Sequence, residues 1–314
     1  MRVLVLGGSG FVGGAAVRRM RARGAEVFTF QRSEGADVRG DRADLARHRD
    51  AFARLAPDVV VDAIAYAEAD AAGLVAAVRG VARRTVVLSS QDVYVPYGRL
   101  LGIDAGAADR APSREDSPLR ASRFPYRGQA SGSDDLAWSY EKILVEEAAS
   151  SDPALPATIL RLPCVYGAGD RHHRVGQVLA RLETGAPFLL DAAKARWRWT
   201  RGAVENVAEA IALAATDDRA SGRVYNVGEE SALSESEWVL RIARASGARV
   251  DVREAGHDEL PGELREPYDF SHDLVADTRR IRGELGYREA VEPESAVALA
   301  VDWERRERRE SPVS

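Results

Sequence analysis

The sequence of 314 residues has only one cysteine, Cys164, and only two lysines, Lys142 and Lys194. A single cysteine excludes an internal disulfide and any zinc or redox site built from paired cysteines. No apolar run reaches the roughly 18 residues that cross a bilayer, and the first run, residues 2–6, is too short for a signal peptide. We therefore expect a cytoplasmic protein with no membrane partner.

The chain also lacks an excess of positive charge. It carries 44 basic and 49 acidic side chains, and its formal charge of −5 argues against a dedicated nucleic-acid-binding protein. The hydrolase pattern Gly-x-Ser-x-Gly and the zinc pattern His-Glu-x-x-His are missing. His172 and His173 are adjacent and do not share a helix face, so we expect no metal site. Because 42 of the basic residues are arginine, a lysine is the rarer and more informative residue.

The first 90 residues alternate short apolar runs with longer mixed segments, as is typical of a parallel sheet with helical crossovers. The expected strands are residues 2–6, 26–30, 59–61, 85–88 and 157–162, and the expected helices are residues 11–23, 42–55, 66–79 and 134–149. Residues 96–132 show no sustained periodicity, and a loop of this length is usually a lid or a binding loop. The C-terminal third is expected to be mostly helical.

A glycine-rich loop, Gly7-Gly8-Ser9-Gly10-Phe11-Val12-Gly13, joins the first strand to the first helix. Gly7 permits the tight turn, Gly10 lets the backbone approach a pyrophosphate, and Gly13 lets the helix pack close to the sheet. The helix N-terminus then offers N–H groups to the anion. This context predicts a dinucleotide-binding site that includes Phe11 and Val12.

The second strand ends without the acidic residue that usually holds the ribose 2′-hydroxyl of NAD. In its place Arg32 is suited to a bidentate contact with a 2′-phosphate, which favours NADP over NAD as the cofactor. NAD stays open as the alternative, because Arg32 is also explained as a solvent-facing side chain. After the third strand, Asp41 is placed either to accept from the adenine amino group, with Arg42 beside it, or only to cap a helix.

Five further segments continue the pattern along the chain. They are Ser89-Ser90-Gln91-Asp92-Val93-Tyr94, Leu160-Arg161-Leu162-Pro163-Cys164-Val165-Tyr166-Gly167-Ala168-Gly169-Asp170, Val204-Glu205-Asn206-Val207-Ala208, Tyr225-Asn226-Val227-Gly228 and Leu285-Gly286-Tyr287. With the glycine loop, these motifs resemble those of the extended short-chain dehydrogenases/reductases, the nucleotide-sugar epimerase/dehydratase family. The resemblance runs from residue 7 to residue 287, which is nearly the whole chain.

The resemblance implies an α/β fold with a doubly wound parallel sheet of the Rossmann type. A dinucleotide-binding domain is expected over residues 1–169, with parts of 202–228 joining its sheet, and residues 170–314 are expected to form mainly a smaller substrate-binding domain. It also implies a homodimer in which residues 66–79 and 134–149 pair with their mates, and a small polar substrate, of which a nucleotide sugar is one candidate. Further cofactor contacts are expected from Ala63, Ile64, Ala65, Lys142, Pro163 and Val165, and substrate contacts from Tyr126, Trp138, Tyr166, Arg174, Arg198 and Arg201.

The catalytic centre departs from the family pattern Tyr-x-x-x-Lys. Lys142 matches the family lysine, but Trp138 stands four residues earlier, and Tyr140 would lie about 200° around an ideal helix from Lys142. We therefore expect Trp138 at the usual tyrosine position, Lys142 on the nicotinamide ribose, and Ser90 orienting the reacting oxygen. The missing proton carrier is left open among Asp92, Tyr94, Tyr126 and Tyr140. A bacterial subgroup resembling this chain also has Tyr-x-Lys.

Two functions remain open at this point. The first is an NAD(P)-dependent epimerase, dehydratase or reductase, which Ser90 and Lys142 favour. The second is a non-catalytic NAD(P)-binding sensor or RNA-associated scaffold, which Trp138 favours because an indole cannot exchange a proton as a phenol does.

Overall fold

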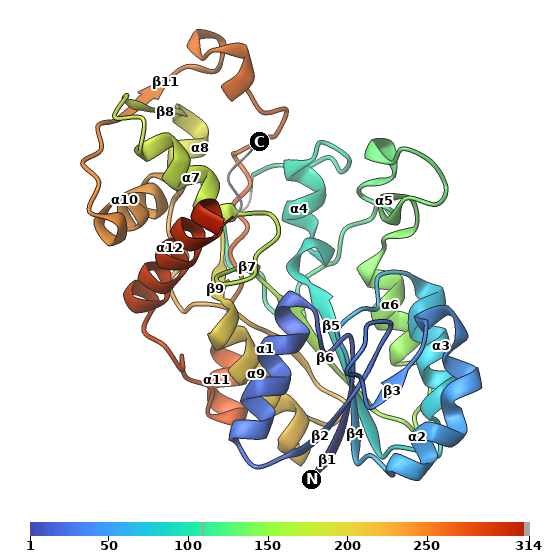
Figure 1. The fold of residues 1–314 in the computed structure, drawn as a ribbon. Helices are drawn as coiled ribbons and strands as arrows, with labels where there is room; N and C mark the ends of the chain where they lie inside the picture. The colour runs from blue at the N-terminus through green and yellow to red at the C-terminus, as the bar shows by residue number, and fades with distance from the viewer. Residues whose placement is uncertain (109, 311–314) are drawn as a thin grey trace.

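The computed structural model describes residues 1–108 and 110–310. Seven parallel strands form its main sheet in the order β10-β6-β5-β4-β1-β2-β3 (Figure 1). Their bounds are β1 (Arg2–Leu6), β2 (Glu26–Gln31), β3 (Val38–Arg39), β4 (Val59–Asp62), β5 (Arg84–Ser90), β6 (Ala157–Leu162) and β10 (Val224–Asn226). The strand order reverses direction next to β1, which confirms the predicted doubly wound fold.

Helices cover both faces of this sheet. On one face lie α1 (Phe11–Ala22), α9 (Val204–Thr216) and α11 (Arg279–Leu285); on the other lie α2 (Arg49–Leu55), α3 (Glu68–Val78) and α6 (Lys142–Ala149). Successive side chains of β1 point to opposite faces, so Val3 and Val5 join one core while Leu4 and Leu6 join the other. Burial on both faces explains why this strand is apolar throughout.

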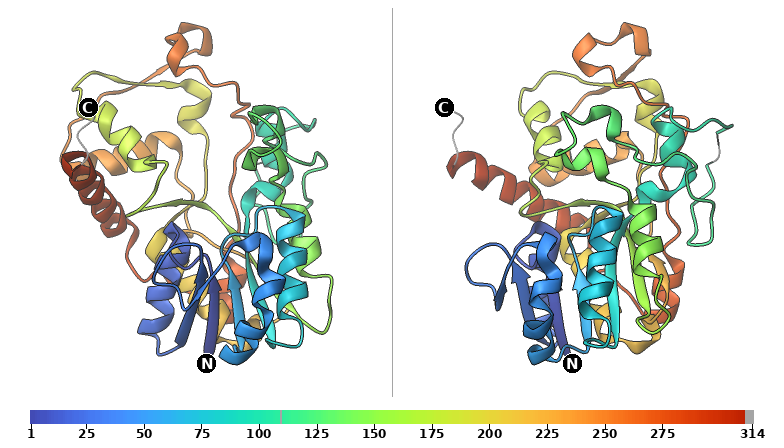
Figure 2. Two further views of the ribbon diagram at one scale, coloured as in Figure 1. Left: turned by 45° about the vertical axis from the view of Figure 1, so that its right-hand side comes forward. Right: turned by 90° about the vertical axis from the view of Figure 1, so that its right-hand side faces the viewer.

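The remaining elements stand above the carboxyl ends of the strands in two groups (Figures 1 and 2). One group contains α7 (Arg174–Leu182), β8 (Phe188–Asp191), α8 (Ala192–Arg196), α10 (Glu235–Ser246), β11 (Val252–Ala255) and α12 (Pro293–Glu310), with a hydrophobic core of its own. The other contains α4 (Val95–Leu100) and α5 (Leu136–Ser139). A short parallel pair, β7 (Cys164–Tyr166) and β9 (Arg201–Ala203), connects the sheet to the first group.

Two expected helices are interrupted. Residues 42–55 form a 3₁₀ segment, η1 (Arg42–His48), followed by α2, because Asp44 has non-helical backbone angles. Residues 134–149 form two helices, since α5 ends at Ser139 and α6 begins at Lys142. Tyr140 and Glu141 between them are extended. The second break changes the geometry of the site.

A buried carboxylate fixes the break between α5 and α6. Glu141 caps α6 by accepting from the backbone N–H of Ile143 at 2.9 Å. Its two oxygens also accept from the guanidinium of Arg120 at 2.7 and 3.0 Å, and one of them accepts from the N–H of Phe124 at 2.6 Å. Both charged side chains are completely buried. The helix therefore cannot continue through residue 141 without leaving Arg120 unpaired in the interior.

Two other expectations concern the surface of the molecule: the homodimer and the absence of a membrane-spanning segment. The outward side of α3 carries the small side chains of Ala69, Ala72 and Ala76, whereas the exposed residue of α6 is Glu147. Pairing of these helices with a second copy stays a prediction. Among the described residues, no helix has both the length and the apolar character needed to cross a membrane.

Removing the carboxylate of Glu141 should destabilise the protein strongly. Glu141→Ala leaves Arg120 buried without its ion pair, and we expect a loss of about 3–5 kcal/mol in the free energy of unfolding. Urea unfolding followed by circular dichroism measures it. Glu147→Ala is the matched control on α6, because Glu147 pairs with Arg123 at the surface; it should cost less than about 0.5 kcal/mol. Equal effects of the two changes would contradict the role given to Glu141.

Candidate active site

The glycine loop forms a cradle at the carboxyl end of β1. Gly7 has φ of +84°, which a side chain would strain, and a Cβ on Gly13 would lie 2.2 Å from the carbonyl oxygen of Gly7. Gly10 caps α1 without a side-chain hydrogen bond, and the first turn of the helix carries no acidic residue. The backbone N–H groups at this helix start are therefore suited to a pyrophosphate, as the sequence predicts.

The loop after β4 borders this cradle. A Cβ on Gly7 would meet Ile64, and one on Gly13 would lie 3.4 Å from the Cβ of Ala63. On the far side, the ring of Phe11 lies against Gly169. The structure thus brings together several residues that were expected to contact the cofactor, and a bound dinucleotide fits the residues present.

Of the residues expected at the adenosine end, Arg32 and Arg42 have different surroundings. Arg32 is exposed at the end of β2, where Ser33 and Ser9 bring their hydroxyl oxygens within 3.5 Å. Arg42 instead donates two hydrogen bonds of 2.7 Å to the buried carboxylate of Asp62. Its expected cofactor contact is not supported, because the guanidinium is already bound inside the protein. Asp41 caps η1 through the N–H of Ala43.

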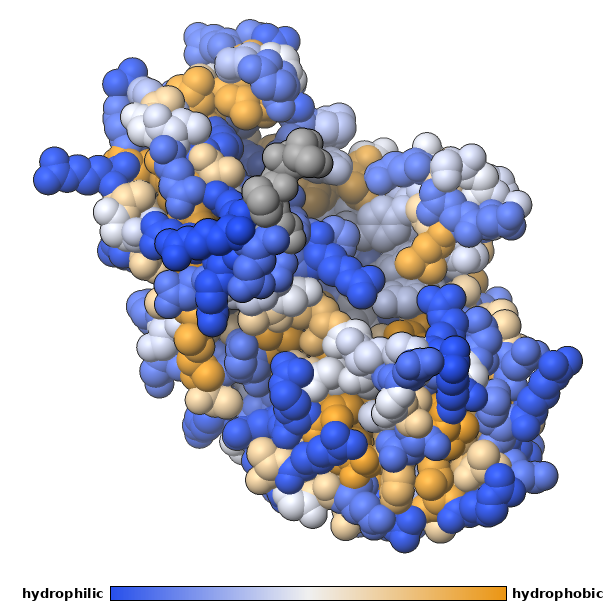
Figure 3. Space-filling model, viewed as in Figure 1, coloured by the Kyte–Doolittle hydropathy of each residue, from blue (hydrophilic) through white to orange (hydrophobic). Residues whose placement is uncertain are grey.

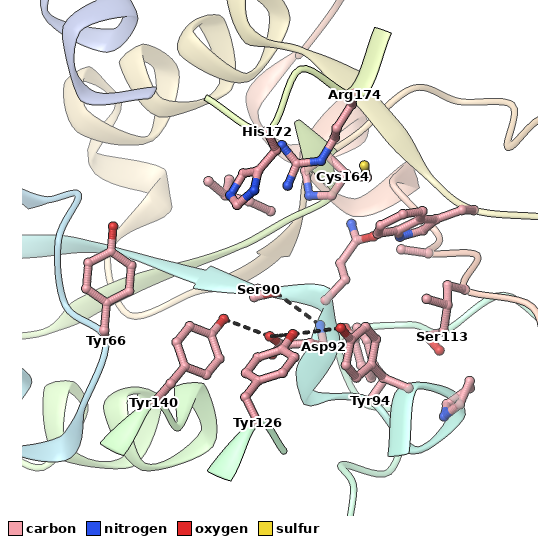
Figure 4. Close-up of a pocket in the computed structure, with 18 of the residues that line it drawn as sticks. Tyr66, Ser90, Asp92, Tyr94, Ser113, Tyr126, Tyr140, Cys164, His172 and Arg174 are labelled. Carbon is pink, nitrogen blue, oxygen red and sulfur yellow. Dashed lines mark hydrogen bonds between the residues drawn. The ribbon is translucent and has the colours of Figure 1, made fainter. Parts of the chain in front are cut away.

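A cavity of about 610 Å³ opens between the two groups of elements above the sheet. Figure 3 shows this face of the molecule hollowed there. The predicted residues that line the cavity are Ser90, Asp92, Tyr94, Tyr126, Tyr140, Pro163 and Arg174. In Figure 4, Asp92 and the tyrosines lie on one side, and Arg174 lies opposite them with His172.

Asp92 is the centre of a hydrogen-bonded cluster of tyrosines. Its Oδ2 atom accepts from the hydroxyl of Tyr140 at 2.7 Å and from that of Tyr126 at 3.3 Å (Figure 4). The hydroxyls of Tyr126 and Tyr97 lie 2.6 Å apart. The other oxygen, Oδ1, is buried without a hydrogen-bond partner, and the whole residue is 4% exposed. An unsatisfied buried carboxylate oxygen is costly and is typical of functional sites.

Tyr140 and Lys142 lie close together, which corrects the expectation of opposite helix faces. That expectation assumed a continuous helix, whereas residues 140 and 141 are extended. The Nζ atom of Lys142 lies 5.8 Å from the ring centre of Tyr140 and 4.8 Å from that of Tyr66. It donates to the carbonyl oxygens of Ala65 at 2.5 Å and Leu88 at 2.9 Å.

Burial shifts the proton affinities of this cluster. It raises the pKa of Asp92 above its ordinary value, although the Tyr140 hydroxyl opposes the shift. The pKa of Tyr140 is raised well above 10, mainly by burial and secondly by the negative charge of Asp92. Burial also lowers the pKa of Lys142 to about 8. Tyr140 is therefore held in its protonated form near neutral pH.

Trp138 does not occupy the expected tyrosine position. It is 43% exposed, its ring lies 5.0 Å from the guanidinium of Arg127, and it does not line the cavity. The short helix α5 instead turns Leu136 and Ala137 toward the cavity. The break after Ser139 explains the error, because it brings Tyr140 rather than Trp138 to the cavity wall.

Other expected site residues have structural roles. Tyr166 is 1% exposed and donates to Glu229 at 2.9 Å, so its predicted substrate contact is wrong. Arg198 lies at the surface, where it bonds to the Ala232 carbonyl and Glu237, and it does not line this cavity. The side chain of Val165 belongs to the hydrophobic core.

The remaining candidate, Tyr94, turns its hydroxyl away from the reaction centre. It donates to Asn226 at 2.7 Å and accepts from Arg161, and burial raises its pKa to about 12. A structural role accounts for all of these contacts.

Several lining residues were not predicted from the sequence. Tyr66 directly follows the loop after β4, so its position at the carboxyl edge was open to prediction. Tyr97 was missed because α4 lies in a segment without clear periodicity. Residues 274–276 reach the cavity by bridging to Trp199 and Ser113, and such distant pairing leaves no local signal.

Comparison with known proteins gives a consistent family relationship. The model of the NAD dependent epimerase/dehydratase family matches residues 3–228. The 2'-dehydrokanamycin reductase of Streptomyces kanamyceticus is 31% identical over 266 residues, which cover 79% of this chain and 67% of that protein.

Two solved structures share the fold. The UDP-N-acetylglucosamine 4-epimerase of Bacillus cereus superimposes with a TM-score of 0.73 at 17% identity, covering 97% of this chain and 99% of that one. The UDP-glucose 4-epimerase of Thermus thermophilus, solved with NAD, gives 0.68 at 23% identity and the same coverage.

The lowered pKa of Lys142 predicts a pH dependence of stability. Between pH 8 and 10.5 the unfolded chain binds a proton that the folded protein has released, so stability should rise with pH in this window. Relative to Lys142→Met, the wild-type protein should gain up to roughly 3 kcal/mol across it, at roughly 1.4 kcal/mol per pKa unit. Urea midpoints of both proteins measured across this range test it; a difference that does not change with pH would contradict it.

Proposed function

The chain belongs to the NAD-dependent epimerase/dehydratase family, and we propose that it uses NADPH to reduce a ketone on a small polyhydroxylated molecule. The observation that carries this proposal is the hydroxyl of Tyr140, which donates to buried Asp92 at 2.7 Å beside the amine of Lys142. A phenol held protonated at a cavity wall is a suitable proton donor to a carbonyl oxygen.

The bound cofactor supplies the hydride that reduces the carbonyl carbon. Ser90 lies at the end of β5 in the cavity wall, where its hydroxyl can orient the carbonyl oxygen. As the C=O double bond becomes a single bond, Tyr140 transfers its proton to this oxygen. The charge of Lys142 favours the phenolate left behind, and water returns the proton after the alcohol leaves.

Reduction is favoured over epimerisation or dehydration by the state of the proton carrier. Burial and Asp92 both raise the pKa of Tyr140, so the hydroxyl carries its proton near neutral pH and the phenolate that would remove a proton from an alcohol is scarce. The similar protein from Streptomyces kanamyceticus is named a reductase. The alternative of a non-catalytic NAD(P)-binding sensor or RNA-associated scaffold loses its support, because it rested on Trp138 in place of a catalytic tyrosine.

The preference for NADP rests on the end of β2. Arg32 is exposed beside Ser33 and Ser9, which together offer a guanidinium and two hydroxyls next to the glycine loop. Such a set suits a 2′-phosphate, whereas the strand end has no carboxylate to accept from a free 2′-hydroxyl.

Tyr140→Phe should lower the rate of ketone reduction by about 10²-fold or more, because it removes the proton donor and leaves the ring. The rate of NADPH oxidation with 2'-dehydrokanamycin, the ketone named for the similar reductase, is the measurement. Affinity for NADP⁺ should stay within about twofold of wild type. Tyr225→Phe is the control, since Tyr225 bonds to Glu284 outside the cavity, and a comparable loss there would argue against Tyr140 as the donor.

Arg32→Ala should weaken NADP⁺ binding by about tenfold, the equivalent of roughly 1.4 kcal/mol, and leave NAD⁺ binding unchanged. Calorimetric titration of both cofactors measures the effect. Arg47→Ala provides a control on η1, because Arg47 is exposed and pairs only with nearby Asp44. If Arg32→Ala leaves NADP⁺ affinity at the wild-type value, the assignment of Arg32 to the 2′-phosphate fails.

A further inference from the structure

The Asp92 carboxyl and the Tyr140 phenol are two acids joined by one hydrogen bond. The Oδ2 atom of Asp92 accepts from the Tyr140 hydroxyl at 2.7 Å, in the wall of the main cavity. A phenol has a single proton to donate, and an ionised carboxylate can only accept hydrogen bonds. While Asp92 is ionised, the Tyr140 proton is therefore directed at the carboxylate and not at a substrate.

No cation is bound to the Asp92 carboxylate within the described residues. The cations that most lower its pKa are Arg120 and Lys142. The guanidinium of Arg120 is paired with Glu141, and the amine of Lys142 donates to two backbone carbonyls. If Tyr140 lost its proton beside an ionised Asp92, two negative charges would lie 2.7 Å apart with only the charge of Lys142 to offset them. Two acids placed so closely do not ionise together.

The other groups that contact the Asp92 side chain are hydroxyls, which form a chain leading away from it (Figure 4). Ser90 lies beside the carboxyl, and Tyr126 donates to Oδ2 at 3.3 Å. The hydroxyl of Tyr97 lies 2.6 Å from that of Tyr126. Because the Tyr126 proton is directed at Asp92, Tyr97 is the donor in the bond between the two phenols. Tyr97 is partly exposed and also borders a second hollow of about 300 Å³, where water can reach it.

We propose that Asp92 carries a proton in the resting protein and passes it to Tyr140 during the reaction. A protonated carboxyl has an O–H group, which donates to the Tyr140 oxygen and leaves the phenol proton free for the ketone oxygen. As the phenol proton moves to the ketone oxygen, the phenolate takes the carboxyl proton. The step ends with an ionised Asp92 beside a neutral Tyr140. It rests on the proposed function in naming Tyr140 as the donor to the ketone.

The chain of tyrosines restores the proton of Asp92 after the alcohol leaves. Tyr126 passes its proton to the carboxylate, Tyr97 passes its own to Tyr126, and Tyr97 takes one from water. One proton thus enters from water for each ketone reduced, and it reaches Tyr140 through Asp92. The raised pKa of Asp92, caused by burial, supports its protonation at rest.

Infrared difference spectra test the resting proton without turnover. The C=O stretch of a protonated carboxyl is separate from the bands of a carboxylate, so the spectrum of wild type minus Asp92→Asn should contain it at neutral pH. Asp135→Asn is the matched control. Asp135 lines the same cavity, but hydrogen bonds from Ser131 and Ala137 lower its pKa, so only carboxylate bands should change. Carboxylate bands alone for Asp92 would overturn the proposal.

The pH dependence of turnover distinguishes a proton carrier from a structural residue. In wild type, NADPH oxidation with saturating 2'-dehydrokanamycin should slow as pH rises through the pKa of Asp92, because the carboxylate then holds the Tyr140 proton. Asp92→Asn should be about tenfold slower at low pH, a smaller loss than removal of the donor, and should lack this decline. Any decline due to His172, across the cavity, or to Lys142 should remain in both proteins. An unchanged profile in Asp92→Asn would overturn the proposal.

Tyr126→Phe interrupts the return path and provides a second test if Asp92→Asn does not fold. Turnover should slow by about threefold or more, and its solvent deuterium isotope effect should increase, because return of the proton becomes limiting. Tyr225→Phe, outside the cavity, is the control and should keep the wild-type isotope effect. A wild-type rate and isotope effect in Tyr126→Phe would contradict the return path.

These experiments separate the proposal from the proposed function. If Tyr140→Phe reduces the ketone at the wild-type rate, the proposed function fails, and the infrared spectra still decide whether Asp92 holds a proton. If Tyr140→Phe is slow but Asp92→Asn keeps the wild-type pH profile, only the transfer from Asp92 fails.

Discussion

The buried ion pair between Arg120 and Glu141 is the constraint on which the site depends. It stops α5, starts α6 and holds the chain between them extended, so that Tyr140 lines the cavity and the amine of Lys142 lies beside its ring. Arg120 also donates to the backbone carbonyl of Asp92 at 2.8 Å. One guanidinium thus sets the relative positions of the carboxylate, the phenol and the amine. Burying the two charges costs free energy, but separating them inside the protein would cost more. The ion pair therefore holds the arrangement rigidly.

The fold was predictable because its signals are local. A strand that is buried on both faces is apolar throughout, and a glycine loop between such a strand and a helix needs no distant partner to be recognised. The strand at residues 2–6 and the helix start at Phe11 accordingly agree with the structure. The motifs that follow, up to residue 287, repeat the order of one family, which fixed the topology of the sheet.

The chemistry of the site was less predictable because it depends on contacts between distant segments. The angle between Tyr140 and Lys142 was calculated for a continuous helix, and the break in that helix is imposed by Arg120, which lies 21 residues before Glu141. The error for Trp138 has the same origin. The ion pair of Arg42 was not foreseen because its partner Asp62 is 20 residues away, at the end of a strand where only apolar residues were expected.

The tyrosine cluster around Asp92 has a consequence for motion. Tyr97 and Tyr126 both come from the segment that follows η2 (Gln91–Val93), and they shield the Asp92 carboxylate from water. If that segment swings outward, the carboxylate becomes hydrated and its pKa falls toward the ordinary value. Proton occupancy and segment position are thus thermodynamically linked. Because burial raises the pKa of Asp92 in the arrangement described, lower pH would favour this arrangement over one that exposes the carboxylate to water.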